Sequence, residues 1–216
     1  MFRICIGSVM QHMAKQIEGV SEELLRCARN EFLGKGFLDA SLRTIATRAN
    51  TSTGAIYRRF GSKEGLYHCL VDAAMEQLIS YFETEATTFN QRPSAEKLDM
   101  LAYIAPKYDA MVNFLYDNLD AFRLILRCPE TGCYERLIHT LCETSDAHTM
   151  RFMQSTGRNP IAEGTLSTVL LRTISRAFFD GLFECILQDM SRDQALVHVR
   201  QLRSFYSSGW EKLFRL

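Results

Sequence analysis

The sequence predicts an all-α protein of about nine helices. Only 4 prolines occur in 216 residues, so few positions oppose long helices. Strictly alternating runs of β-branched residues, which would indicate strands, are missing. Apolar side chains recur at helical spacing instead, for example at Leu66, Leu70, Ala74 and Leu78.

The composition is that of an ordinary globular protein, with 47% hydrophobic and 23% charged residues. No apolar stretch reaches the roughly 18 residues of a membrane span. The segment from Phe2 to Ile6 is too short and too weakly charged for a signal peptide. Seven cysteines, an odd number without tight paired spacing, indicate reduced thiols. We therefore expect a cytoplasmic protein with no membrane partner.

Three short helices are predicted in residues 21–68, after an N-terminal extension over residues 1–20 that we expect to be partly flexible. The first helix starts after Ser21, because serine is a favourable N-cap and two acidic residues follow it. It should end around Gly34 and Gly36, since glycine favours helix ends.

The second and third helices are expected at residues 42–49 and 53–59. Ser41 offers the N-cap of the second helix and Ser52 that of the third. Between them, Asn50 tolerates the left-handed conformation that a turn between helices requires. This segment therefore predicts two helices joined by three polar residues.

A single helical domain is expected over residues 69–216. A fourth helix begins after the break at residues 61–64 and continues into this domain. Further breaks are marked by prolines, glycines and short polar residues. They delimit helices at about 94–118, 119–127, 133–155, 161–189 and 192–215.

Charge is distributed unevenly although the formal net charge is zero. Residues 1–68 contain ten Lys and Arg against six Asp and Glu, a net charge of +4, so the remainder carries −4. The segment from Ala40 to Lys63 contains no acidic residue. Its five basic residues indicate an acidic partner such as DNA: Arg43, Arg48, Arg58, Arg59 and Lys63.

The helix pair has the dimensions of a helix-turn-helix, whose second helix reads the major groove. Five apolar residues would face the core, namely Ile45, Ala46, Ala49, Ile56 and Phe60. The outward face then shows groups that can address phosphates and bases: Thr53, Tyr57, Arg58 and Arg59. A solvated basic face on an ordinary helix pair is the alternative interpretation.

Three stretches of sequence closely resemble the DNA-binding signature of the tetracycline-repressor (TetR) family. They are Leu42 to Ala46, Thr53 to Phe60 and Ser62 to Leu66. The resemblance covers about residues 21–70, and the rest of the chain is similar to the family in length and helix pattern. It implies a DNA-binding transcriptional regulator, usually a repressor, that binds a palindromic operator in double-stranded DNA as a homodimer.

The resemblance also implies roles for individual residues. Ser41 and Tyr57 would contact phosphates, Arg43 would approach a base edge, and Lys63 would anchor the start of the fourth helix. The DNA-binding set is completed by residues of the third helix and its N-cap, which would enter the groove or bind the DNA backbone: Ser52, Thr53, Gly54, Ala55, Arg58 and Arg59. The family often has glycine at the position of Asn50 and histidine at that of Arg59, and arginine there should increase salt dependence.

The last two helices suit a two-fold four-helix interface between two copies of the chain. Their stripe of apolar and small residues is Gly181, Val199, Leu202, Tyr206, Gly209 and Leu213. Packing of the same stripe within the monomer is the alternative, because an internal core and a dimer seam look alike in sequence.

An effector pocket between about residues 94 and 180 is implied by the resemblance, with a small molecule releasing the operator. The candidate lining mixes apolar walls with hydrogen-bonding groups: Met100, Tyr103, Lys107, Met111, Tyr134, Ile138, Arg172, Arg176 and Phe179. Ordinary core packing explains most of these residues equally well.

Other classes of function are less favoured by the sequence. We find none of the nucleophile, metalloprotease, P-loop or dinucleotide motifs of enzymes and expect neither catalysis nor a cofactor. A metal or thiol sensor would use Cys128, Cys133, His139 and Cys142, but their spacing matches no strong zinc pattern. A helical protein-interaction scaffold is the remaining alternative, and it does not explain the acid-free basic segment.

Overall fold

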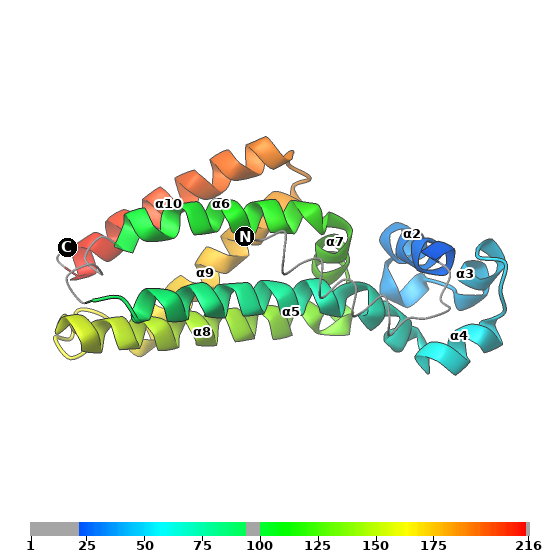
Figure 1. Ribbon diagram of the computed structural model, residues 1–216, viewed down its shortest axis with the longest axis horizontal. Coiled ribbons are helices and arrows are strands. Elements are labelled where there is room, and N and C mark those ends of the chain that lie inside the picture. The colour runs from blue at the N-terminus through cyan, green and yellow to red at the C-terminus, as the bar shows by residue number, and fades with distance from the viewer. Residues whose placement is uncertain (1–21, 94–99, 215–216) are drawn as a thin grey trace. The chain divides into compact units, whose positions relative to one another are not determined.

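The computed structural model describes residues 22–93 and 100–214, and all regular structure in these ranges is helical (Figure 1). Nine α-helices, α2 to α10, and one 3-10 helix follow one another along the described chain. The prediction of an all-α protein with about nine helices is therefore confirmed. The chain divides into two compact units, residues 1–70 and 71–216.

The first unit contains α2 (Glu22–Asp39), α3 (Leu42–Arg48), α4 (Thr53–Phe60) and the start of α5 (Lys63–Asn90). The helical path of α2 is kinked at Gly36, whose φ of 76° lies in the region that favours glycine. Three aromatic rings pack together in the core of this unit. Tyr67 lies edge-on to Phe32 and Phe37, with ring centroids 5.5 and 5.3 Å away.

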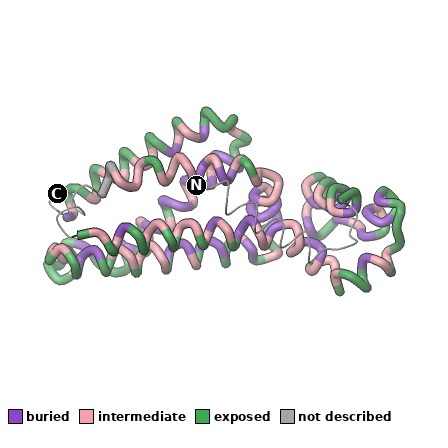
Figure 2. The backbone as a smooth tube through the Cα atoms, in the orientation of Figure 1, coloured by how far each residue is buried: buried purple, intermediate pink, exposed green. Residues whose placement is uncertain are grey.

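The second unit contains the rest of α5 and six further elements. These are α6 (Met100–Asp117), α7 (Leu119–Arg127), the 3-10 helix η2 (Pro129–Thr131), α8 (Cys133–Thr156), α9 (Thr168–Leu187) and α10 (Arg192–Phe214). Helix α9 packs against α7, α8 and α10, and α10 also packs against α6. Buried residues therefore run along much of α9 (Figure 2).

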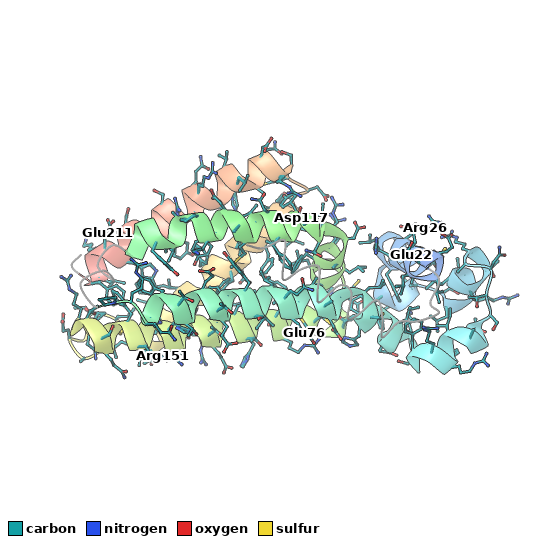
Figure 3. The ribbon with its side chains drawn as sticks, viewed as in Figure 1. Glu22, Arg26, Glu76, Asp117, Arg151 and Glu211 are labelled. Carbon is teal, nitrogen blue, oxygen red and sulfur yellow. The ribbon has the colours of Figure 1, made fainter. Side chains whose placement is uncertain are left out.

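Charged side chains mark the outer faces of the helices in both units. Glu22 and Arg26 project from α2, while Glu76 and Arg151 project from α5 and α8 (Figure 3). Among the described helices, none is both long enough and apolar enough to cross a membrane.

Helix α9 begins later than the sequence analysis expected, at Thr168 rather than residue 161. Residues 160–166 form a turn, because the Pro160 carbonyl accepts hydrogen bonds from the backbone N–H groups of Thr165 and Leu166, at 2.9 and 3.1 Å. Ser167 then caps α9 by accepting a hydrogen bond from the Leu170 N–H at 3.0 Å. The helix start expected at residue 161 was therefore wrong.

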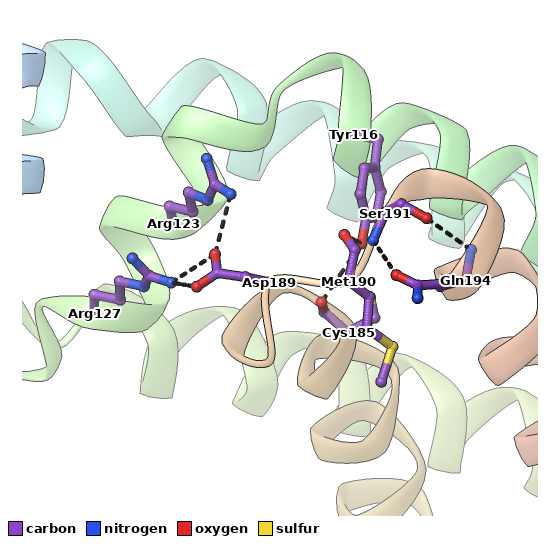
Figure 4. Close-up of polar contacts among 8 residues, drawn as sticks. All are labelled: Tyr116, Arg123, Arg127, Cys185, Asp189, Met190, Ser191 and Gln194. Carbon is purple, nitrogen blue, oxygen red and sulfur yellow. Dashed lines mark hydrogen bonds and ion pairs between the residues drawn. The ribbon is translucent and has the colours of Figure 1, made fainter.

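The turn between α9 and α10 is held by polar contacts to α6 and α7 (Figure 4). Arg127 donates to both carboxylate oxygens of Asp189 at 2.8 Å, and Arg123 donates to one of them at 3.0 Å. The Tyr116 hydroxyl donates to the Met190 carbonyl at 2.8 Å. Asp189 itself has a φ of 49°, which is uncommon for a residue with a side chain. These contacts fix a turn that the local sequence alone would leave strained.

Candidate nucleic-acid interface

Helices α3 and α4 form the expected helix-turn-helix, and local capping sets its geometry. The Ser41 hydroxyl accepts a hydrogen bond from the Thr44 N–H at 3.3 Å, and the Ser52 hydroxyl accepts one from the Ala55 N–H at 3.1 Å. Asn50 takes a φ of 51° in the turn between them. Both predicted caps and the left-handed turn residue are confirmed.

Helix α4 buries one side and exposes the other. Ile56 is fully buried, whereas Tyr57 is 54% exposed. Phe60, which was expected to face the core, is half-buried. The remaining predicted contact residues of α4 lie at the surface, with Thr53 and Ala55 half-buried and Gly54, Arg58 and Arg59 exposed. The structure therefore places these side chains on an accessible helix.

Two of the arginines are available to a partner. Arg43 on α3 and Arg58 on α4 are exposed, and their guanidinium groups have no hydrogen-bonding or ion-pair partner among the described residues. A guanidinium in this state can bind a phosphate or a guanine edge without first breaking a contact within the protein.

The buried carboxylate of Glu31 fixes the position of α3. It is 2% exposed and accepts a hydrogen bond from the Ser41 N–H at 3.3 Å, next to the start of α3. It also pairs with Arg48 at 3.2 Å, at the end of α3, and with Lys35 at 2.9 Å. One carboxylate therefore holds both ends of this helix, and Arg48 is engaged within the domain.

Burial alone would raise the pKa of Glu31. The hydrogen bonds from Lys35 and Ser41 and the positive charges of Lys35 and Arg48 outweigh that effect and hold its pKa below the ordinary value. The carboxylate is therefore ionised at neutral pH. Sequence reasoning missed Glu31, because its partners Ser41 and Arg48 lie ten and seventeen residues away.

Lys63 lies at the start of α5 and is tied to the end of α2. Its ammonium donates to the Leu38 carbonyl at 2.8 Å and lies 5.0 Å from the centre of the Phe37 ring. The contact joins α2 to α5 within the first unit. A substitution of Lys63 would thus affect the domain as well as any phosphate contact.

The two glycines at positions 54 and 65 differ in what surrounds them. A Cβ on Gly54 would meet only the Ser52 hydroxyl, at an ordinary 3.8 Å, so packing does not require glycine there. A Cβ on Gly65 would lie 2.0 Å from the Phe60 carbonyl oxygen, which no real side chain tolerates. Gly65 is needed for the turn between α4 and α5. At Gly54, no side chain projects from the exposed face of α4.

A second candidate site is a cavity of about 170 Å³ in the second unit, lined by α5, α6, α8 and α10. Three of the nine predicted pocket residues line it, namely Tyr103, Lys107 and Met111. The side chain of Met100 lies outside the described residues. Sequence reasoning missed the aromatic walls supplied by Phe89, Phe152, Trp210 and Phe214, because they come from three helices whose approach no local pattern reveals.

The other predicted pocket residues lie on α8 and α9 and do not line this cavity. Tyr134 donates to Asp180 at 2.6 Å, and Arg176 pairs with Asp180 and with Glu135. Arg172 pairs with Asp146 of α8. Ile138 and Phe179 are buried in the core of the second unit.

The predicted dimer stripe packs largely against its own chain. A Cβ on Gly181 would lie 3.1 Å from Leu202, Val199 is 1% exposed, and the Tyr206 ring lies edge-on to Phe178. Leu213 packs against the cluster around Phe152, whereas Gly209 is exposed. Most of the stripe therefore serves the monomer, and other residues of α9 and α10 stay exposed.

The candidate metal or thiol residues are not brought together as a site. Among the described residues, no group of three or more His, Cys, Asp and Glu is placed to hold a metal ion. Cys128, Cys133 and Cys142 are buried, and burial raises the pKa of the Cys142 thiol to about 11. His139 is exposed and lies 3.5 Å from Glu143.

The chain matches one protein-family model, and its fold is similar to that of many solved structures. Residues 24–69 match the family model for bacterial regulatory proteins of the tetR family. No curated protein sequence matches the chain significantly.

Among solved structures, SmeT, the repressor of the Stenotrophomonas maltophilia multidrug efflux pump SmeDEF, is 14% identical with a TM-score of 0.59, covering 86% of this chain and 90% of its own. Salmonella enterica GusR is 20% identical with a TM-score of 0.57, covering 90% and 94%. The TetR family transcriptional regulator PfmR from Thermus thermophilus is 19% identical with a TM-score of 0.56, covering 90% and 98%.

At these identities the solved structures show a shared fold over most of the chain. The family match covers nearly all of α2, the helix-turn-helix of α3 and α4, and the start of α5. Residues 24–69 of this chain are therefore similar to the bacterial regulatory proteins of the tetR family, and most of the chain shares the fold of the three solved structures.

Proposed function

We propose that the protein is a ligand-responsive repressor that binds a palindromic operator as a homodimer and releases it when a small molecule binds the second unit. The observation that carries the proposal is the exposed face of α4, together with the uncommitted guanidinium groups of Arg43 and Arg58. In the proposed complex, α4 is the recognition helix, which lies in the major groove and contacts the bases.

Homodimer formation is supported by what remains exposed on the last two helices. One helix-turn-helix reads few base pairs, so useful affinity requires two copies about one helical turn apart, ~34 Å. Large apolar side chains that stay exposed there are Val169, Leu170, Leu187, Val197 and Phe205, with Phe205 at 77%. We place the interface on these residues and on Gly209, rather than on Val199, which the monomer itself buries.

Repression and release by an effector are supported by the shared fold and by the cavity in the second unit. SmeT is described as a repressor, and the fold that it shares with this chain supports the same direction of regulation. The cavity between α5, α6, α8 and α10 offers a site for the effector. We also place the protein in the cytoplasm, where its operator would be.

Selection from a random library of DNA duplexes tests the proposal without knowledge of the operator. We expect the bound duplexes to share a palindrome whose two halves lie about one helical turn apart. Tyr57→Ala should weaken binding to all duplexes, whereas Arg43→Ala should relax the sequence preference. Enrichment of a non-palindromic sequence, or of no sequence, would contradict the proposal.

A further inference from the structure

The size of the cavity limits what it can hold. Its volume is about 170 Å³, whereas pockets for drug-sized ligands measure roughly 300–1,000 Å³. An engineered cavity of about 150 Å³ in another protein binds benzene. The space between α5, α6, α8 and α10 therefore suits one six-membered ring with a small substituent.

The walls of the cavity form a connected series of aromatic rings. Phe89 lies 5.3 Å from Tyr103 and 6.1 Å from Phe152, measured between ring centroids. Phe152 lies 5.0 Å from Phe214, which stacks on Trp210 at 5.4 Å. Offset and edge-on contacts with such rings favour another aromatic ring over an aliphatic group of the same volume.

The charged groups of the lining compensate one another. Glu85 and Lys107 form an ion pair at 2.9 Å. Burial, and then the positive charge of Arg151, lower the pKa of His148, so this ring is neutral at pH 7. An anionic ligand would meet Glu85 and a cationic ligand would meet Lys107. The lining therefore favours a neutral ligand.

One carboxylate oxygen of Glu85 is left to accept a hydrogen bond. Lys107 and the Tyr103 hydroxyl, at 2.9 and 3.4 Å, both contact its Oε2 atom. Its Oε1 atom has no hydrogen-bonding partner among the described residues. A ligand hydroxyl can donate to this oxygen without displacing Lys107.

We propose that the cavity binds a neutral, single-ring aromatic compound with a hydroxyl group, that is, a simple phenol. Its ring would lie between the aromatic walls, and its hydroxyl would donate to Glu85. This inference rests on the proposed function, in which the second unit binds an effector.

The full-length chain can be titrated with four probes: p-cresol, toluene, benzoate and decanoate. Trp210 is the single tryptophan of the chain and lines the cavity, so its fluorescence reports occupancy, with calorimetry as the second readout. We expect p-cresol to bind at least about tenfold more tightly than each of the other probes, a difference that corresponds to one hydrogen bond or one unpaired charge. Tighter binding of benzoate or decanoate, or no binding of p-cresol, would overturn the proposal.

Two variants locate the ligand in the cavity. Glu85→Gln keeps the shape but leaves Lys107 without its counter-charge, so benzoate should gain about tenfold in affinity and p-cresol should lose about as much. Ala86→Phe should fill the cavity and abolish p-cresol binding, whereas Thr87→Phe, at an exposed position on the same helix, should bind like the wild type. An unchanged probe order in Glu85→Gln contradicts the assignment, even if Ala86→Phe does not fold.

DNA binding measured on the same preparation separates this inference from the proposed function. If the protein selects a palindrome but binds no p-cresol, the ligand assignment alone is wrong. If p-cresol binds as expected and no duplex is selected, the ligand assignment stands and the proposed function fails.

Discussion

Glycine has opposite roles at positions 54 and 65, because the surroundings of the two residues differ. Gly65 approaches the Phe60 carbonyl so closely that no side chain fits, whereas nearly open space surrounds Gly54. The fold requires glycine at position 65 and does not require it at position 54. We propose that Gly54 lets a DNA partner approach α4 closely.

The variants Gly54→Ala and Gly65→Ala test this difference. Gly54→Ala should leave stability unchanged or raise it by up to about 1 kcal/mol, because alanine favours helix, but it should weaken DNA binding about tenfold. Gly65→Ala should cost about 1–3 kcal/mol through the clash with the Phe60 backbone. Chemical denaturation and DNA titration measure both effects, and a stability loss in Gly54→Ala would contradict the assignment.

Glu31 gives the first unit a specific dependence on pH. Because its folded-state pKa lies below the ordinary value of 4.5, its contacts stabilise the fold fully above that pH. Their contribution is lost as the pH falls through the folded-state pKa. We expect Glu31→Gln to lower the free energy of unfolding by about 1–3 kcal/mol at neutral pH.

Denaturation of the wild type and Glu31→Gln across pH measures this effect. The difference between the two proteins should shrink as the pH falls below 4.5. A difference that stays constant from neutral to acidic pH would show that the carboxylate charge does not matter. Lys35→Ala is a suitable companion, since it removes one of the partners while the carboxylate remains.

Individual residues could be predicted from the sequence where their role is local. Ser41 and Ser52 cap the helices that follow directly, and Asn50 forms the turn between them, so neighbouring residues sufficed. Glu31 could not be found in this way, because its burial and its pairing with Arg48 depend on the packing of α2 against α3.

Among the elements, the turn between α9 and α10 depends on ion pairs rather than on its own sequence. Asp189→Asn keeps a residue that tolerates the left-handed conformation but removes the charge that Arg123 and Arg127 share. We expect a lower Tm and faster hydrogen exchange in the turn. The loss should diminish at high salt, since the ion pairs are solvent-accessible.

An Asp189→Asn protein with the wild-type Tm and exchange rates would show that the turn is fixed by other contacts, such as that of Tyr116 with Met190. The pH dependence supplies a second check. The arginines hold the pKa of Asp189 below its ordinary value of 3.8, so their contribution should be lost as the pH falls below that value.

Helix boundaries show where sequence patterns reach their limit. The breaks before α7, α8 and α10 were predicted from proline, glycine and short polar residues. The start of α9 was placed too early, because the Pro160 turn is closed by backbone hydrogen bonds and Ser167 supplies the cap. Pro106 lies inside α6, where it removes one backbone donor from the helix.

For the whole molecule, the proposed dimer is tested at its most exposed aromatic residue. Phe205→Glu should place a charge in the interface and shift the mass in solution from dimer to monomer. Leu38→Glu is the matched control, because Leu38 is 72% exposed but lies in the first unit. Sedimentation measures both, and a Phe205→Glu protein that stays dimeric would move the interface elsewhere.

The lining of the cavity was predicted from the sequence only in part. Tyr103, Lys107 and Met111 were among the candidates because the family resemblance implied a pocket in residues 94–180 with both apolar and hydrogen-bonding groups, and α6 brings these three residues to the cavity. Phe89, Phe152 and Trp210 were not, because three further helices bring them to the same space. Most residues of the predicted dimer stripe pack within their own chain. The sequence left open whether they would pack there or against a second copy.

The central claim is that the exposed face of α4 binds DNA, and the salt dependence of that binding tests it most directly. The logarithm of the binding constant should fall steeply with the logarithm of salt concentration, and Arg58→Ala should reduce the slope by about one unit. Arg26→Ala, on α2 and paired with Glu23, should keep the wild-type slope. Salt-independent binding, or equal slopes for Arg58→Ala and the wild type, would contradict the account.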